Sequence, residues 1–374
     1  MRFETKAIHV GQDPDPTTGA AVVPIYQTST YVQQEVGEHK GFEYSRTGNP
    51  TRAALESCIA SLESASFGLA FASGMAAEDA VLRLLSSGDH VVLGDDVYGG
   101  TRRLFDKVLV RFGLSFTSVD TTSLDDVRSA IQPNTKLIWI ETPTNPYLRI
   151  ADIEALSALG HEHDCLICVD NTFASPFLQR PLDLGADLVV HSTTKYLGGH
   201  SDVVGGAVCT KDKGLAETLY YLQNAVGAVP GAFDSWLVLR GIKTLGVRMR
   251  QHCENAMAVA SFLLEHPIVE KVWYPGLPTH PGHEIATRQM DGFGGMVSFE
   301  VGSKAQALQI VSRTKVFFLA ESLGGVESLI EHPAAMTHAS IADSPFGVSD
   351  KLIRLSVGIE HPDDLIEDLK TALT

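Results

Sequence analysis

The sequence lacks the features that mark several large classes of protein. Its 29 lysines and arginines are outnumbered by 45 aspartates and glutamates, and the formal charge of −16 leaves no basic excess for binding nucleic acid. No stretch approaches the roughly 20 consecutive apolar residues of a membrane-spanning helix. The first ten residues, MRFETKAIHV, have neither the basic start nor the apolar core of a signal peptide. We therefore expect a cytoplasmic protein that binds neither nucleic acid nor membranes.

Cysteine is scarce, with five residues scattered along the chain. An odd, dispersed set argues against a disulfide framework. Cys165 and Cys168 have the CxxC spacing of redox and metal sites, but they lie in CLICVD, an apolar run typical of a buried strand. Side chains three apart on a strand point to opposite faces, so these two thiols are not expected to converge.

Two further absences concern ligands. His161 and His163, like His280 and His283, are close enough in sequence to share a metal ion, but no cysteine or carboxylate cluster supports either pair. We therefore expect no metal. A G-x-G-x-x-G motif after the first strand, with an acidic residue about 20 positions on, is also missing, which argues against a nucleotide-binding oxidoreductase.

The composition is that of a folded chain with more than one compact part. The 374 residues, 44% of them hydrophobic, exceed the usual size of one domain. Residues 1–45 show little periodicity and are interpreted as an extended arm. Residues 46–245 are predicted to form a large α/β domain, and residues 246–374 a smaller α+β domain.

Within the large domain, short apolar runs alternate with amphipathic stretches of helical spacing. The runs lie at residues 67–73, 90–96, 114–120, 136–142, 166–171 and 187–193. This alternation predicts βαβ units and a mostly parallel sheet that is buried on both faces. Farther on, a long helix is predicted over residues 247–265.

Polar residues that suit one ligand follow three of these runs, and ligands bind at the carboxyl ends of strands in such sheets. Gly74 opens a helix whose first N–H groups suit a phosphate. Asp170 ends a buried run and needs a partner, such as a protonated ring nitrogen. Lys195 stands among small hydroxyl residues and glycines, where a partly desolvated amine can form a Schiff base. In isolation each has an ordinary explanation: a common turn, a helix cap, a solvated lysine.

Taken together, these residues suit a ligand that has a phosphate, a ring nitrogen and an aldehyde. Ser192 and Thr194, two residues apart, are placed to face the phosphate, and Tyr98 at a fourth strand end offers a ring that can stack on the ligand. Pyridoxal 5′-phosphate (PLP) has all of these groups, and Lys195 is expected to hold it.

The chain resembles the PLP-dependent Cys/Met metabolism family, which includes cystathionine γ-synthase, cystathionine γ-lyase, cystathionine β-lyase and methionine γ-lyase. The matching segments run from the arm to the C-terminal part and lie at residues 44–56, 71–77, 95–101, 141–146, 169–182, 191–206, 320–338 and 353–360. The resemblance implies the PLP-dependent transferase fold of type I, which is aspartate aminotransferase-like, with a mostly parallel seven-stranded sheet.

The resemblance also implies a role for each site residue. Cofactor-binding roles fall to the Schiff-base lysine, the partner of the ring nitrogen, the stacking tyrosine and the groups around the phosphate: Lys195, Asp170, Tyr98, Gly74, Met75, Ser192 and Thr194. Lys195 is implied to move protons, and Tyr98 to act as an acid or base. Substrate-binding roles fall to the residue that pairs with the α-carboxylate and its helpers: Arg354, Ser322, Asn145 and Glu321.

Two residues of the arm are implied to act in another subunit. Tyr44 and Arg46 resemble family residues that reach the phosphate of the neighbouring subunit's cofactor. The resemblance therefore implies a homotetramer built as a dimer of dimers, with sites shared across subunits.

The motifs identify the cofactor better than the reaction. Methionine γ-lyases carry a cysteine where this chain has residues 99–101, and they, like β-lyases, usually lack a glutamate at the position of Glu321. The resemblance thus favours a γ-synthase that makes L-cystathionine from an O-acylhomoserine and cysteine in methionine biosynthesis. A γ-lyase, which splits cystathionine into cysteine, 2-oxobutanoate and ammonia in transsulfuration, is the close alternative, and one enzyme can have both activities.

A protein that kept the fold and lost the chemistry is the other alternative. Such a protein is expected to have lost one of the residues on which catalysis depends. Lys195, Asp170 and Arg354 are all present, so the sequence favours an enzyme.

Overall fold

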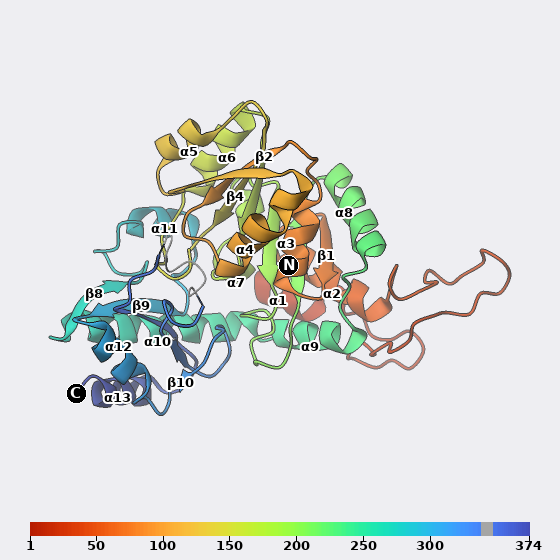
Figure 1. Ribbon diagram of the computed structural model, residues 1–374. Coiled ribbons are helices and arrows are strands. Elements are labelled where there is room, and N and C mark those ends of the chain that lie inside the picture. The colour runs from red at the N-terminus through yellow and green to blue at the C-terminus, as the bar shows by residue number, and fades with distance from the viewer. Residues whose placement is uncertain (338–346) are drawn as a thin grey trace.

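The computed structural model describes residues 1–337 and 347–374. His338, the last residue of the matching segment 320–338, lies outside the described residues. Two sheets organise the chain, each with its own helices, and the arm extends from the larger part as a long loop (Figure 1).

The large sheet has seven strands in the order β1-β7-β6-β5-β4-β2-β3. They are β1 (Phe67–Phe71), β2 (His90–Gly94), β3 (Ser115–Val119), β4 (Thr135–Glu141), β5 (Leu166–Asp170), β6 (Leu188–Ser192) and β7 (Gly206–Thr210). Strand β7 pairs antiparallel with both of its neighbours, and all other pairs are parallel. The predicted mostly parallel seven-stranded sheet is confirmed, and the carboxyl ends of its parallel strands meet at one edge.

Helices cover both faces of this sheet, as a parallel sheet requires. They are α2 (Pro50–Leu62), α3 (Gly74–Leu82), α4 (Gly99–Lys107), α5 (Leu124–Ala130), α6 (Ile153–Glu162), α7 (Ser175–Leu178), α8 (Lys213–Val226) and α9 (Ala232–Ile242). One apolar cluster joins the sheet to α3, α4 and α8, and another joins its opposite face to α2, α6 and α9. Apart from the edge strand β3, the strands are buried almost throughout, which explains why they form continuous apolar runs in the sequence.

The second sheet has the order β10-β11-β12-β9-β8 and is mostly antiparallel. Its strands are β8 (Val269–Trp273), β9 (Met296–Val301), β10 (Phe318–Leu319), β11 (Leu329–Glu331) and β12 (Leu352–Ser356), and its helices are α11 (His283–Gln289), α12 (Lys304–Val311) and α13 (Pro362–Ala372). Helix α10 (Leu245–Glu265) packs its first half on the large core and its second half on the small one. The predicted domain boundaries at residues 45 and 245 stay predictions.

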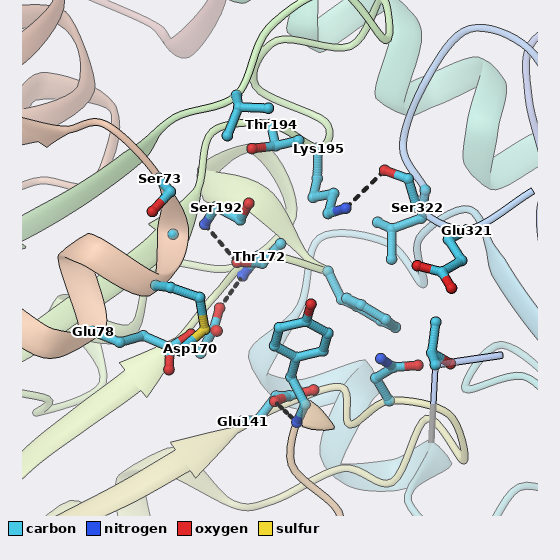
Figure 2. Close-up of a pocket in the computed structure, with 18 of the residues that line it drawn as sticks. Ser73, Glu78, Glu141, Asp170, Thr172, Ser192, Thr194, Lys195, Glu321 and Ser322 are labelled. Atoms are coloured by element: carbon cyan, nitrogen blue, oxygen red, sulfur yellow. Dashed lines mark hydrogen bonds between the residues drawn. The ribbon is translucent and has the colours of Figure 1, made fainter. Parts of the chain in front are cut away.

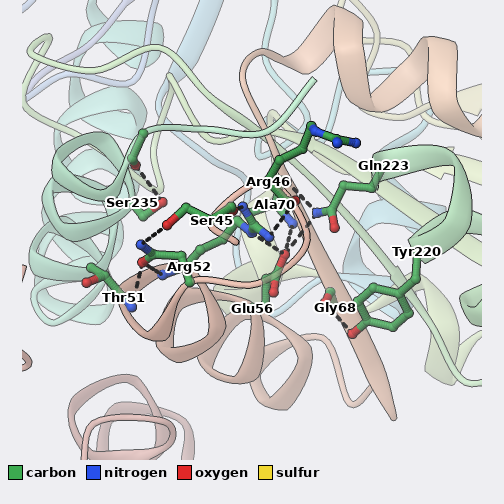
Figure 3. A network of polar contacts seen from close by, with 12 residues as sticks. Ser45, Arg46, Thr51, Arg52, Glu56, Gly68, Ala70, Tyr220, Gln223 and Ser235 are labelled. Carbon is green, nitrogen blue, oxygen red and sulfur yellow. Dashed lines mark hydrogen bonds and ion pairs between the residues drawn. The ribbon is translucent and has the colours of Figure 1, made fainter. Parts of the chain in front are cut away.

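The arm begins with a docked helix, α1 (Phe3–His9), followed by irregular chain. The Phe3 ring meets Phe177 edge-on at 5.2 Å, while much of the chain between residues 19 and 44 is exposed. A buried arginine, Arg52 of α2, anchors the end of the arm by donating hydrogen bonds to the carbonyl oxygens of Ser45 (2.7 Å) and Arg46 (3.1 Å), as Figure 3 shows. The arm therefore ends in a fixed position although most of its length lacks a core.

The CxxC pair behaves as its strand position predicts. Cys165 packs into the cluster on one face of the large sheet and Cys168 into the cluster on the other, and both thiols are free.

Within the described ranges, no three histidine, cysteine or acidic side chains gather as metal ligands do. No helix in the described part of the chain is long and apolar enough to cross a membrane.

Candidate active site

A cavity of about 300 Å³ lies at the carboxyl edge of the large sheet, where the small domain meets it (Figure 2). The residues predicted from the sequence that line it are Gly74, Met75, Tyr98, Asn145, Asp170, Ser192, Thr194, Lys195, Glu321, Ser322 and Arg354. The residues that line it without having been predicted are Ser73, Glu78, Glu141, Thr172, Phe173, Val204, Leu323 and Thr337. One hollow thus collects side chains that are up to about 280 residues apart in sequence.

Lys195 lies in the turn after β6, and its amine reaches across the cavity. Lys195 Nζ donates a hydrogen bond to Ser322 Oγ at 2.7 Å. Burial lowers the pKa of Lys195 to about 8; Arg354 lowers it as well, while two carboxylates oppose the shift. Ser322 adopts φ = 89°, a region that non-glycine residues rarely enter, so a strained residue holds the amine in place.

One end of the cavity is built to hold an anion. The Ser73 hydroxyl caps α3 by accepting from the amide of Ala76 at 3.1 Å, and the first two helical amides, those of Gly74 and Met75, have no carbonyl within the helix to bond. A Cβ on Gly74 would lie 2.9 Å from the Cβ of Ser192, so only glycine allows the helix to start this close to β6. Helix N-terminal amides beside a serine hydroxyl form a site that suits a phosphate.

The same end receives the Thr194 hydroxyl, which is fixed by the main chain. Thr194 Oγ1 accepts a hydrogen bond from the amide of Gly205 at 3.1 Å. The same hydroxyl donates to the carbonyl oxygen of Gly205 at 3.3 Å, so it must rotate before it can donate to an acceptor in the cavity.

A second part of the cavity holds carboxyl groups. Asp170 ends β5 and accepts a hydrogen bond from the amide of Thr172 at 2.9 Å. Glu141 ends β4 and accepts a hydrogen bond from the amide of Tyr98 at 2.8 Å. Glu78, which belongs to α3, lies beside Asp170 (Figure 2). Burial raises the pKa of each of these carboxyl groups, that of Glu78 to about 8. A cationic ring nitrogen would supply the counter-charge that this region needs.

Tyr98 precedes α4, with its side chain 39% exposed at the cavity. A Cβ on Gly100 would come within 2.3 Å of the Tyr98 ring. Glycine at this position therefore leaves the ring the space that it occupies, and the exposed ring is available for stacking.

The substrate end of the cavity is formed by the small domain. Arg354, on β12, donates from Nη1 to Asn145 Oδ1 at 2.9 Å and from Nη2 to the carbonyl oxygen of Ser322 at 2.8 Å. It also forms a 3.0 Å ion pair with Glu331, a residue that the sequence analysis missed. Glu321 lines the same end of the cavity. A fixed guanidinium near a primary amine is the arrangement that binds an amino acid by its carboxylate.

Tyr44 and Arg46 do not line this cavity. Arg46 Nη1 donates instead to the carbonyl oxygen of Asn224 at 2.6 Å, and its guanidinium lies 5.5 Å from the centre of the Tyr44 ring. Both residues lie on the surface of the single chain. Their contribution to a neighbouring subunit's site therefore stays a prediction.

The donor set fits PLP. The cradle between Gly74 and Ser192 matches a phosphate, the half-buried Asp170 matches a protonated ring nitrogen, and the amine of Lys195 matches an aldehyde. These three features lie around one cavity, as a single ligand requires.

Comparisons with known proteins agree with this fit. A cystathionine gamma-synthase of Mycobacterium tuberculosis is 61% identical over 372 residues, which cover 99% of this chain and 96% of that protein. A cystathionine beta-lyase of Lactococcus lactis is 57% identical, with 99% and 98% covered. The structure of a cystathionine gamma-lyase from Lactobacillus plantarum complexed with L-serine matches with a TM-score of 0.97 and 53% identity, covering 100% of this chain and 98% of that one.

These relatives are named for three different reactions, all of which form or cleave cystathionine. The profile of the Cys/Met metabolism PLP-dependent enzymes matches residues 4–374. The chain is therefore a PLP-dependent enzyme and belongs to the Cys/Met metabolism family.

Proposed function

We propose that this enzyme forms L-cystathionine by replacing the acyl group of an O-acylhomoserine with the sulfur of cysteine, in methionine biosynthesis. The observation that carries the proposal is the position of Glu321, which shares the cavity with Arg354 and Lys195. A carboxylate there can pair with the amino group of the incoming cysteine while the guanidinium holds the homoserine ester.

The cofactor-binding roles follow the donor set. Gly74 and Met75 would offer amides to the phosphate, Ser192 and Thr194 hydroxyls, and Asp170 its carboxylate to the ring nitrogen. The ring of Tyr98 would lie against that of the cofactor. When bound, PLP withdraws electrons from the carbon that carries the substrate amino group.

Lys195 Nζ is proposed to bind the cofactor's aldehyde and then to move protons, first from Cα and then from Cβ of the substrate. Its depressed pKa leaves a sizeable unprotonated fraction near neutral pH, as a general base requires. The hydrogen bond to Ser322 keeps the amine on the side of the cavity where Arg354 holds the α-carboxylate. Tyr98 is close enough to the cavity to assist as an acid or base.

A γ-lyase is the second candidate, because the same residues serve it. In the synthase reaction, the γ-carbon loses a carboxylic acid and gains the sulfur of cysteine. In the lyase reaction, the γ-carbon–sulfur bond of cystathionine breaks and one water is consumed, giving cysteine, 2-oxobutanoate and ammonia. A difference of a few kcal/mol in the barriers decides between them. A relative named cystathionine gamma-synthase is 61% identical to this chain and one named cystathionine gamma-lyase is 55% identical, a small difference that favours the synthase.

A product assay on the purified enzyme tests the proposal. We expect cystathionine to form from O-succinyl- or O-acetylhomoserine plus cysteine faster than cystathionine alone is broken down. Glu321→Gln should raise the KM for cysteine about tenfold, the effect of losing one charged hydrogen bond, and leave cysteine-independent cleavage of the ester within about twofold. Glu270→Gln, which removes the carboxylate of an exposed ion pair with Lys351, is the matched control. Breakdown of cystathionine as the only reaction would replace the synthase with the lyase.

We also propose a homotetramer made of two dimers, in which Tyr44 and Arg46 complete the neighbouring subunit's phosphate site. The support is that the arm is exposed over most of its length while Arg52 fixes its end. A segment held at one end and without a core of its own suits a partner chain.

Mixing two inactive variants tests the shared site. Arg46→Ala and Lys195→Ala each inactivate every site in their own oligomers. A mixed dimer regains one active site, which combines an intact Lys195 from one subunit with an intact Arg46 from the other. Random exchange of subunits should restore roughly a quarter of wild-type activity. The activity is measured after incubating the variants together and, as the control, each variant with itself. Absence of any recovery in exchanged oligomers would contradict the shared site.

A further inference from the structure

Glu331 is a buried acid at the substrate end that the proposed mechanism does not use. It lies on β11, directly opposite Arg354 of β12 in the antiparallel register. Residues opposite each other on neighbouring strands project to the same face, which brings the two side chains together. Glu331 is 1% exposed and Arg354 3%, and Glu331 Oε1 lies 3.0 Å from Arg354 Nη1.

The guanidinium of Arg354 meets three acceptors from three separate segments, and only one of them is charged. Asn145 and the carbonyl oxygen of Ser322 orient the two terminal nitrogens, and Glu331 adds a full negative charge. Thr337 Oγ1 donates to the same oxygen, Glu331 Oε1, at 2.9 Å. Among the described residues, Glu331 Oε2 and Arg354 Nε have no hydrogen-bond partner.

This pair is costly if it serves only stability. A buried carboxylate with one unsatisfied oxygen loses hydration that a single ion pair does not fully restore, and burial accordingly raises the pKa of Glu331 while Arg354 opposes the shift. The other charged groups that act on Glu331 are Glu321 and Lys195, which also face the cavity. The charge of Glu331 is thus placed where the substrate's charges are expected.

A substrate carboxylate must bind a guanidinium that already has one carboxylate. The second negative charge is attracted by Arg354 and repelled by Glu331, so the net attraction is smaller than for an unpaired arginine. Glu331 also stabilises the protonated amine of Lys195, against the effect of Arg354. An enzyme that must release an amino-acid product gains from carboxylate binding that is weak and well oriented.

We propose that Glu331 is a positioning residue that orients Arg354 and, by offsetting its charge, weakens the binding of substrate carboxylates. The proposal rests on the proposed role of Arg354. If Glu331 orients and offsets Arg354, removing its charge while keeping the hydrogen bond should strengthen carboxylate binding. A purely structural role predicts the opposite change in affinity.

The test uses the PLP-loaded enzyme and two unreactive probes, L-alanine and L-alaninamide, titrated through the change in the visible absorption of the cofactor. Glu331→Gln should lower the Kd of alanine about tenfold and leave that of alaninamide, which has no carboxylate, within about twofold. The control Glu270→Gln should change neither value.

The possible outcomes distinguish the proposed role of Glu331 from a structural role. Weaker alanine binding in Glu331→Gln would show a structural role and overturn the proposal. If the Glu331→Gln variant does not fold, Glu331→Ser removes the same charge and leaves room for water, and the same increase in alanine affinity is expected. Failure of both variants to load PLP would also overturn the proposal. Equal affinity of the wild-type enzyme for alanine and alaninamide would instead contradict the role of Arg354, which separates the two claims.

Discussion

Replacing Lys195 by alanine is expected to lower kcat by about 10³-fold or more, while PLP still binds in a weaker, non-covalent form. The estimate follows from the two functions that one amine combines, because proton transfer by a positioned base alone contributes about 10²–10⁴-fold. Asp170, the amides of Gly74 and Met75, and the hydroxyl of Ser192 remain in the variant, so part of the cofactor affinity is retained. The measurements are single-turnover and steady-state rates, together with the PLP content after dialysis.

The control for Lys195→Ala is an exposed lysine of the same sheet region. Lys211 forms an ion pair with Asp183 at 2.9 Å, and its side chain is 47% exposed. Lys211→Ala should keep wild-type turnover, because an exposed pair contributes little to stability and does not reach the cavity. Turnover of Lys195→Ala within tenfold of wild type would remove Lys195 from its assigned role.

The residues at the ends of strands were predictable from the sequence for a physical reason. Asp170 and Lys195 each follow a continuous apolar run, and the carboxyl ends of parallel strands meet at one edge. Local sequence thus predicted both the element and the edge at which the side chain emerges. Helix α3 begins at Gly74, where the turn after the first strand was expected to open a helix, and Ser73 takes the cap position.

The residues that the sequence analysis missed reach the cavity through long-range packing. Glu78 is an acid within an amphipathic helix, a pattern normally read as a solvated face, yet α3 packs so that this side chain is 3% exposed. Glu331 sits on a strand of three residues whose partner, β12, lies more than 20 positions away. No local pattern distinguishes either of them from a surface glutamate.

The same reasoning explains what was missed in the fold. Strand β7, with the sequence GAVCT, was not singled out because it is short and begins with small residues, although all five of its residues are buried. Its antiparallel pairing depends on β1 and β6, which come from distant parts of the chain. A short helix in the arm is compatible with the sequence, but the position of α1 depends on contacts, such as that of Phe3 with Phe177, which no local pattern predicts.

Asp170→Asn is the second variant for which a large effect is expected. We expect it to leave the cofactor-free protein as stable as wild type or more stable, and to weaken the PLP-loaded enzyme. In the cofactor-free protein, burial and then the charge of Asp170 raise the pKa of both Glu78 and Glu141, so the three carboxyl groups disfavour one another's ionisation. The amide keeps the shape of the side chain and removes this repulsion. We therefore expect a Tm for the cofactor-free variant that is equal to or higher than that of wild type.

In the loaded enzyme the same substitution leaves a cationic ring nitrogen without its counter-ion. Breaking a buried ion pair by removing one partner costs about 3–5 kcal/mol, which corresponds to a PLP affinity about 10²–10⁴-fold lower. The measurements are PLP titration of the cofactor-free protein and thermal unfolding of both forms, with the exposed Asp183→Asn as the control. A variant that bound PLP as tightly as wild type would show that Asp170 has no ionic partner in the cofactor. A lower Tm in the cofactor-free form would show that its carboxylate is structural. The combination of a stable cofactor-free protein and a weakened loaded one is expected only if the buried charge of Asp170 is retained for the ligand, since stability is commonly lost at a site that is shaped for function.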